Sequence, residues 1–240
     1  MERILGILGG MGPLATADFM EKIIRATPAS CDQDHVAVIA ASLPQIPDRS
    51  AAITGEGPSP LAAMVGAVRR LERAGVGAIA IPCNTAHHWH DAISRHTERP
   101  LFHIADAALD AIRETGGAAR VGLLATTGTL ASGMYAARLA RAGITTMAPD
   151  ETAQEYLVMA GIRAVKGGDV AAGARALAAA ADGLLDRGAG RIIMACTEVP
   201  PALAAANRTG GVYVDATDAL ARACVKWHRE PRTAAVPRAA

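Results

Sequence analysis

The chain has 240 residues, of which 51% are hydrophobic, 20% charged and only 3% aromatic. Its formal net charge of +1 gives no field that would gather polyanions, and no run of Lys and Arg is interleaved with aromatic residues, so we expect no nucleic-acid partner. The composition excludes a wholly disordered chain and is typical of a helix-rich enzyme. The length allows one large α/β domain or two small ones.

The first apolar run helps to predict the cellular compartment of the protein. Residues 4–8 have no basic region before them, and no apolar run approaches the ~20 residues that span a bilayer, so we expect a cytoplasmic protein with no membrane partner. In a reducing compartment the four cysteines, Cys31, Cys83, Cys196 and Cys224, are expected as thiols. Their spacing contains no paired zinc-ligand motif, and we expect no metal site.

Short runs of Ile, Val and Leu alternate with longer Ala-rich amphipathic stretches, which predicts β-α units around parallel sheets. Strands are predicted, in chain order, at residues 3–8, 35–41, 78–82, 101–104, 120–125, 145–148, 191–195 and 212–214. Two intervening helices have a clear apolar face or composition, at residues 61–74 and 170–185. Residues 42–60 are rich in Pro and Gly without periodicity, which predicts a functional loop.

An internal repeat links the two halves of the chain. One set of five residues recurs with the same spacing: Leu71, Gly75, Gly77, Ile79 and Cys83 match Leu184, Gly188, Gly190, Ile192 and Cys196. A second set has nearly the same offset: Gly6, Leu8 and Gly12 match Gly122, Leu124 and Gly128. The repeat predicts a duplicated unit. Chance similarity is the alternative, because Gly-x-Gly-x-Ile before a strand is common in α/β proteins.

Cys83 and Cys196 each follow a predicted strand, where a loop leads into a helix. Ligands bind beyond the carboxyl ends of strands in parallel sheets, and N–H groups at a helix start lower a thiol pKa from ~8.5 towards neutrality. Each thiol could then act as acid or base. The alternative is that a cysteine at the end of a buried strand is simply a small hydrophobic residue. Cys31 lies in a predicted loop and Cys224 on the C-terminal helix, without matching partners, and we interpret both as structural.

Five motifs in order resemble the aspartate/glutamate racemase superfamily, in its aspartate racemase branch. They are Gly9-Gly-Met-Gly-Pro13, Pro44-Gln-Ile-Pro-Asp-Arg49, Pro82-Cys-Asn-Thr-Ala-His87, Gly122-Leu-Leu-Ala-Thr-Thr-Gly128 and Cys196-Thr-Glu198. The resemblance covers nearly the whole chain. It implies two similar α/β domains with parallel four-stranded sheets, related by a pseudo-twofold axis, and an active site in the cleft between them. We place the first domain at residues 1–104 plus 211–240 and the second at residues 105–210.

The resemblance also implies an isomerase without pyridoxal phosphate or another cofactor, acting on a small amino acid, and a homodimer. The glutamate racemase branch has Asp-Ser-Gly in the first loop and Cys-Thr-His after the second thiol, where this chain has Gly10-Met11-Gly12 and Cys196-Thr197-Glu198. This departure favours aspartate or a broader set of amino acids. The presence of both cysteines favours a racemase or epimerase over a decarboxylase.

Racemisation removes a proton from one face of Cα and delivers another to the opposite face, so Cys83 and Cys196 are the predicted catalytic pair. Without an electron sink, fixed donors must stabilise the carbanion. The predicted substrate-binding residues are Met11, Gln45, Arg49, Asn84, Thr85, Thr127, Lys166, Thr197 and Glu198. The resemblance implies that Arg49 and Lys166 hold a side-chain carboxylate. The alternative is that each is a solvated surface charge. Glu198 would accept the substrate ammonium or orient Cys196, and it could equally cap a helix.

Three alternatives remain at this point. Gly10-x-Gly12-x-x-Ala15 fits a relaxed dinucleotide fingerprint, but the second strand has no acidic residue at its end to hold a ribose. The chain could be an epimerase of a related small carboxylic acid. It could also be a non-catalytic amino-acid-binding protein with a redox-sensitive cysteine pair.

His87, His88 and His90 form a cluster whose spacing is not that of a zinc site.

Overall fold

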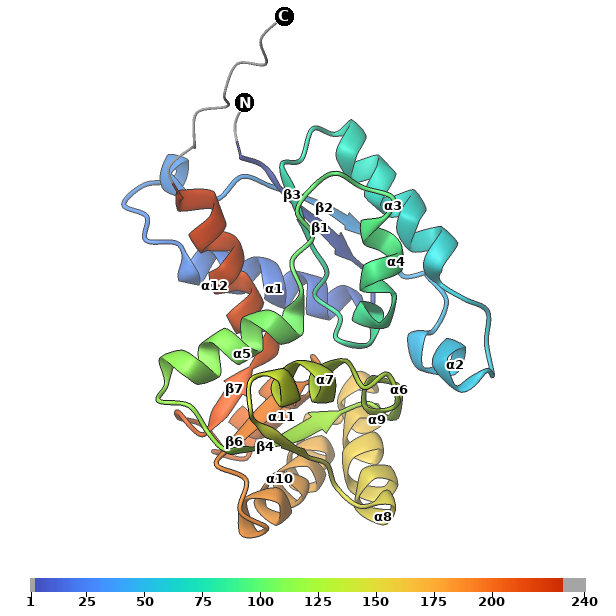
Figure 1. Ribbon diagram of the computed structural model, residues 1–240, viewed down its shortest axis with the longest axis vertical. Helices are drawn as coiled ribbons and strands as arrows, with labels where there is room; N and C mark the ends of the chain where they lie inside the picture. Colours follow the sequence, from blue (N-terminus) through green and yellow to red (C-terminus); the bar gives the residue numbers. More distant parts are fainter. Residues whose placement is uncertain (1–2, 231–240) are drawn as a thin grey trace, which may run out of the picture.

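The computed structural model describes residues 3–230, which form two parallel sheets with helices around them (Figure 1). The first sheet has the order β2-β1-β3, with β1 (Leu5–Gly9), β2 (Val38–Ser42) and β3 (Ala78–Ala80). The second has the order β5-β4-β6-β7, with β4 (Arg120–Ala125), β5 (Thr145–Met147), β6 (Arg191–Ala195) and β7 (Tyr213–Asp215). The structure confirms the predicted α/β class with two parallel sheets.

The helices connect and cover these strands. They are α1 (Pro13–Ala26), η1 (Asp32–Asp34), α2 (Arg49–Thr54), α3 (Leu61–Arg73), η2 (Thr85–Trp89), α4 (His90–Ser94), α5 (Ile104–Glu114), α6 (Thr127–Ala131), α7 (Met134–Arg141), α8 (Glu151–Ala153), η3 (Gln154–Met159), α9 (Ala160–Lys166), α10 (Val170–Asp186), α11 (Val199–Ala205) and α12 (Ala216–Arg229). Within residues 3–230, none of them is both long enough and apolar enough to cross a membrane.

The two helices predicted most clearly from periodicity are present. In α3 the buried residues include Met64, Val68 and Leu71, which share the apolar face expected from the sequence. α10 is rich in Ala and packs closely against α9 and α11. Its N-terminus is capped by Asp169, whose carboxylate accepts a hydrogen bond from the Ala172 N–H at 2.9 Å.

The sequence repeat corresponds to equivalent places in the two sheets. Gly6 on β1 pairs with Ile79 on β3, and Gly122 on β4 pairs with Ile192 on β6 in the same relation. The Gly77 N–H donates to the Ile4 carbonyl at 2.7 Å, and the Gly190 N–H donates to the Arg120 carbonyl at 2.9 Å. The matching glycines therefore start matching strands, and the repeat has a structural basis.

One detail of the predicted topology needs correction. The first sheet has three strands instead of four, because residues 101–104 make only one bridge, Ile79↔Leu101, before α5 begins. β7 pairs with β6 in the second sheet. α12, which follows β7, packs against α1 and α5. The division into domains stays a prediction, and residues 231–240 lie outside the described part.

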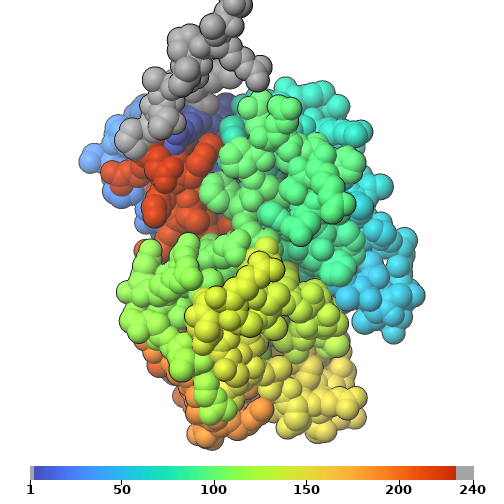
Figure 2. All heavy atoms as spheres, in the orientation of Figure 1, coloured from blue at the N-terminus to red at the C-terminus, as the bar shows by residue number. Residues whose placement is uncertain are grey.

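The core includes one hydrophobic cluster that joins the halves and two that lie on outer faces. The joining cluster contains Phe19 of α1, Ile104 of α5, Tyr135 of α7 and Leu220 of α12. Figure 2 shows the two halves closed against each other along their boundary, with the cyan segment around α2 at its edge. This packing brings the carboxyl ends of the two sheets towards a common region.

Candidate active site

Cys83 and Cys196 occupy equivalent places just beyond strand ends. β3 ends at Ala80, three residues before Cys83, and β6 ends at Ala195, directly before Cys196. Each cysteine is 7% exposed. Both line one small cavity of about 30 Å³, so the fold brings the two predicted thiols to a single site.

The cavity wall contains all the predicted site residues except Gln45 and Thr127. Its full lining is Met11, Asp48, Arg49, Ser50, Cys83, Asn84, Thr85, Thr126, Lys166, Cys196, Thr197 and Glu198. Gln45 is exposed on the loop before α2, and Thr127 is exposed, with its hydroxyl accepting a hydrogen bond from Gln154 Nε2 at 3.4 Å. The neighbouring Thr126 lines the cavity, whereas Thr127 does not.

Asp48, Ser50 and Thr126 also line the cavity, although they are not among the predicted residues. Asp48 lies within the motif that ends at Arg49, and Ser50 follows that motif directly, so the motif indicated this part of the wall. Thr126 directly follows β4, at the carboxyl end of a strand that pairs on both sides. It caps α6, because its hydroxyl accepts a hydrogen bond from the Thr129 N–H at 3.1 Å.

Glu198 holds the thiol of Cys196. The Cys196 Sγ–H donates to Glu198 Oε2 at 2.9 Å, and the Thr197 hydroxyl donates to the same oxygen at 3.1 Å. Burial and the neighbouring Glu198 carboxylate raise the pKa of Cys196 well above its ordinary value. Cys196 is therefore a thiol at neutral pH, with a carboxylate placed to accept its proton.

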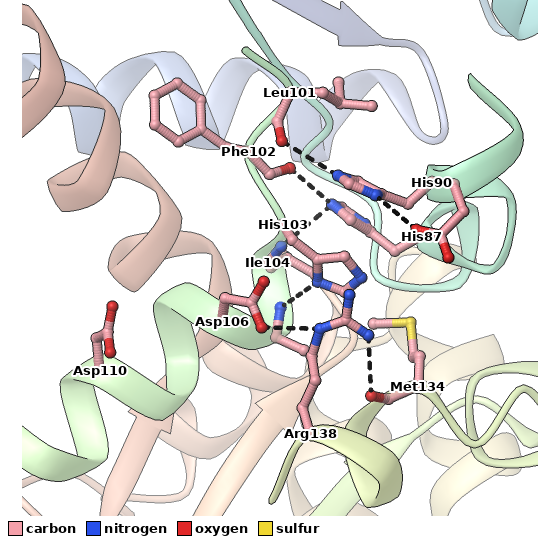
Figure 3. A network of polar contacts seen from close by, with 12 residues as sticks. His87, His90, Leu101, Phe102, His103, Ile104, Asp106, Asp110, Met134 and Arg138 are labelled. Carbon is pink, nitrogen blue, oxygen red and sulfur yellow. Dashed lines mark hydrogen bonds and ion pairs between the residues drawn. The ribbon is translucent and has the colours of Figure 1, made fainter. Parts of the chain in front are cut away.

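A buried histidine, His87, is hydrogen-bonded to the backbone of Cys83. Its Nδ1–H donates to the Cys83 carbonyl at 2.9 Å. Its Nε2 accepts from the Ile104 N–H at 3.2 Å (Figure 3). Burial lowers the pKa of His87 to about 4, so the ring is neutral at physiological pH. In Figure 3 His90 and His103 lie next to this ring, with centroids 5.9 and 4.8 Å away.

The histidine cluster does not form a metal site in the part of the chain that the structure describes. His103 accepts the Ala105 N–H at 3.1 Å and so caps α5, while His90 lies 3.1 Å from the Leu101 carbonyl through Nε2. Both rings therefore form hydrogen bonds with backbone groups between Leu101 and the first turn of α5. The cluster therefore fixes the wall behind Cys83.

Polar side chains join the two halves beneath the cavity. The hydroxyls of Thr85, Thr126 and Thr129 form a triangle with oxygen–oxygen distances of 2.9 to 3.0 Å. Tyr135 donates its hydroxyl to Asn84 Oδ1 at 2.6 Å. Thr85 and Asn84 come from the first half and their partners from the second, so these bonds fix the halves relative to each other at the site.

The segment around α2 closes over the cavity. The Arg49 guanidinium donates to the carbonyls of Ile46 and Pro47 at 3.1 and 3.0 Å, which folds this loop on itself. α2 packs on α6, and Gly128 of α6 lies so close to Ser50 that an added Cβ would be 2.9 Å from the Ser50 Cα. The predicted irregular loop at residues 42–60 therefore contains a short helix that bridges the halves.

Gly10 explains part of the glycine pattern that resembled a dinucleotide fingerprint. Its φ is +90°, and a Cβ there would be 2.2 Å from the backbone nitrogen of Leu43. Only glycine permits this close approach of the loop after β1 to the loop after β2. The first glycine of the pattern is thus required by packing.

A wider groove adjoins the small cavity. It has a volume of about 980 Å³ and shares the residues Asp48, Arg49, Lys166, Thr197 and Glu198 with the cavity. The cavity itself has a volume on the scale of a water molecule. The shared residues place the groove directly beside the cavity, at the segment around α2.

Residues 8–224 match the model of the Asp/Glu/hydantoin racemase family. The chain belongs to this family. Among solved structures it is similar to the Picrophilus torridus aspartate racemase, with 31% identity, a TM-score of 0.82 and coverage of 94% of each chain. An aspartate racemase homologue from Pyrococcus horikoshii OT3 has 24% identity and a TM-score of 0.76, with coverage of 96% of this chain and 100% of that one.

A broad specificity amino-acid racemase, RacX of Bacillus subtilis (strain 168), is 34% identical over 138 residues, which are 55% of this chain and 58% of the relative. The family and its neighbours support amino-acid racemisation as the activity of this Asp/Glu/hydantoin racemase family member. The superfamily resemblance drawn from the sequence motifs is therefore confirmed.

Proposed function

We propose that this chain racemises a free amino acid without pyridoxal phosphate, with Cys83 and Cys196 acting as acid and base on opposite faces of Cα. The observation that carries the proposal is that two thiols from equivalent places in the two halves line one buried cavity. A single fixed group exchanges protons on one face only, whereas a pair from two related halves can reach both.

The protonation state of Cys196 before the reaction determines its role for each enantiomer. Cys196 keeps its proton and donates it in a hydrogen bond to Glu198. Cys196 is therefore the proton donor for the enantiomer whose α-proton faces Cys83. For the other enantiomer Glu198 first takes the Cys196 proton and keeps it, while the Cys196 thiolate removes the α-proton and the Cys83 thiol donates. This turnover leaves Cys83 as a thiolate, Cys196 as a thiol and Glu198 protonated. From that state the opposite direction runs with Glu198 still protonated, and it restores the Cys83 thiol and the Cys196 thiolate.

The carbanion requires fixed donors in place of an electron sink, each worth roughly 3 kcal/mol of transition-state stabilisation. Among the residues lining the cavity, Asn84 Nδ2 and Arg49 Nε are buried nitrogen donors without a hydrogen-bond partner. The threonine hydroxyls, by contrast, are engaged with one another. Asn84 is therefore the leading candidate to hold the substrate carboxylate as charge develops on it.

Aspartate is the substrate that we favour, with glutamate or a broader set as the wider possibility. Lys166 and Arg49 lie at the boundary of the cavity and the groove, where a side-chain carboxylate would lie. The named activity of the Picrophilus relative supports aspartate, and that of the Bacillus relative supports a broader range. The homodimer and the cytoplasmic location stay predictions.

The direct test is a chiral chromatography assay of L-aspartate, L-glutamate and neutral amino acids with no cofactor added. We expect racemisation of at least one acidic amino acid, and a loss of roughly 10²-fold or more in Cys83→Ser and in Cys196→Ser. Cys31→Ser is the matched control, because Cys31 is exposed and remote from the cavity lining. Ligand binding without racemisation by the unmodified chain would show a binding protein instead and overturn the proposal.

A further inference from the structure

The side chain of Tyr135 is buried between the halves, and the mechanism proposed above does not use it. Tyr135 lies on α7, is 1% exposed and donates its hydroxyl to Asn84 Oδ1 at 2.6 Å. Figure 1 shows α6 and α7 along the side of the second half that faces the first. Burial raises the pKa of Tyr135, so the phenol keeps its proton and stays a donor throughout the working pH range.

An amide has one acceptor end and one donor end. With Oδ1 engaged by Tyr135, the Asn84 side chain presents Nδ2 at its other end, and this nitrogen is buried without a partner beside a cavity that Asn84 lines. A buried donor without a partner is costly unless a ligand supplies an acceptor. If the amide rotated, it would present its carbonyl oxygen instead, which repels a carboxylate.

We propose that Tyr135 is a positioning residue, which holds the Asn84 amide with its N–H groups directed at the carboxylate of the substrate. This inference rests on the proposed function and adds the residue that sets the polarity of one wall of the site. Because Asn84 belongs to the first half and Tyr135 to the second, the substrate-binding donor is set across the boundary between them. The neighbouring threonine triangle crosses the same boundary.

The test is a double-mutant cycle of Tyr135→Phe and Asn84→Ala, read as kcat and KM for the amino acid that the unmodified chain racemises best. Tyr135→Phe removes one oxygen, and we expect kcat/KM to fall roughly 10- to 100-fold. In the Asn84→Ala background the same change should have no further effect, because the hydroxyl acts through Asn84. Tyr213→Phe is the matched control, since Tyr213 lies on β7 outside the cavity lining.

Two further measurements keep the inference testable if Tyr135→Phe folds poorly or if the unmodified chain racemises nothing. Asn84→Asp keeps an acceptor for Tyr135 but replaces Nδ2 with an oxygen, and we expect it to abolish carboxylate binding. The side-chain amide signals of Asn84, identified in an ¹⁵N NMR spectrum by their loss in Asn84→Ala, should move in Tyr135→Phe.

Absence of racemisation by the unmodified chain would overturn the proposed function alone. Unchanged kinetics in Tyr135→Phe, unchanged Asn84 amide signals, or full activity of Asn84→Asp would overturn the role of Tyr135. Equal losses from Tyr135→Phe in both backgrounds would show an effect that bypasses Asn84 and would also overturn it.

Discussion

The chemistry of the site depends on a few side chains whose surroundings set their protonation. Cys196 faces a carboxylate, whereas His87 behind Cys83 is neutral because it is buried. The two cysteines thus have different neighbours, a carboxylate at Cys196 and a neutral imidazole at Cys83, although they lie at equivalent strand ends. The cysteines themselves were predictable, because each follows a repeated strand motif; the partner of Cys196 was predicted only as one of several roles for Glu198.

Replacing Glu198 with Gln should lower the pKa of Cys196, because the carboxylate that raises it loses its charge. The pH midpoint for alkylation of Cys196, followed by mass spectrometry of its peptide, should therefore move to lower pH. Exposed Cys31 is the internal control and should not change. An unchanged Cys196 midpoint would contradict the role assigned to the Glu198 charge.

The same variant should racemise roughly 10²-fold more slowly, because Gln cannot accept the thiol proton. The loss in kcat/KM should be equal for the two enantiomers, which have equal free energies in solution. Chiral chromatography started from each enantiomer measures both values. Activity equal to that of the unmodified chain would show that Cys196 needs no carboxylate acceptor.

The neutral state of His87 predicts how stability depends on pH. Its pKa is about 4 in the folded chain and ordinarily 6.5, so the unfolded state binds more protons between these values. Its contribution is complete above pH 6.5 and is lost as the pH falls towards 4, by about 3 kcal/mol in total. His103, also buried with a lowered pKa, acts in the same direction.

Urea unfolding at several pH values checks this prediction. The free energy of unfolding should fall from pH 6.5 to pH 4, and His87→Asn should show a shallower fall while keeping a donor for the Cys83 carbonyl. Identical slopes in the two proteins would show that His87 does not contribute to the pH dependence.

At the scale of elements, two strand-loop-helix units form the walls of the cavity, and the short helix α2 covers it. The walls were predictable from the sequence, since apolar periodicity and glycine spacing define β3, β6, α3 and α10. α2 was not, because it is short, lies among prolines and glycines, and is held by its contact with α6. Residues 101–104 likewise carried a strand pattern but make only one bridge.

Gly128→Ala tests the closure of α2. The added Cβ would be 2.9 Å from the Ser50 backbone, so α2 must shift away and the site should close less completely. We expect kcat/KM to fall roughly tenfold or more. Gly66→Ala on α3 is the matched control, since nothing lies within 4 Å of the added atom, and its kinetics should match the unmodified chain. Normal kinetics in Gly128→Ala would contradict closure by this contact.

At the scale of the whole molecule, a buried cation ties the halves together away from the site. Lys22 on α1 lies 2.7 Å from Asp215 Oδ2 and 2.6 Å from Asp18 Oδ2, and donates to the Thr217 hydroxyl at 2.8 Å. The Lys22 side chain is 16% exposed. Asp215 ends β7 and caps α12, so this contact links the first half to the second sheet. Its residues are far apart in the chain, and no local pattern indicates the pairing.

Lys22→Met should lower the free energy of unfolding by about 2 kcal/mol, because it leaves the largely buried Asp215 carboxylate without its cation. Arg222→Met is the matched control: its ion pair with Asp218 on α12 is exposed, and its loss should cost under about 1 kcal/mol. Urea unfolding at neutral pH measures both. Similar losses in the two variants would contradict the special role of Lys22.

The central claim is that one thiol removes the α-proton while the other delivers a new one. The most direct measurement is the isotope content of both enantiomers at low conversion in deuterium oxide, starting from one protiated enantiomer. We expect deuterium at Cα of nearly every product molecule and almost none in the remaining substrate. A product that keeps the original protium, or a substrate that is labelled as fast as product forms, would contradict it.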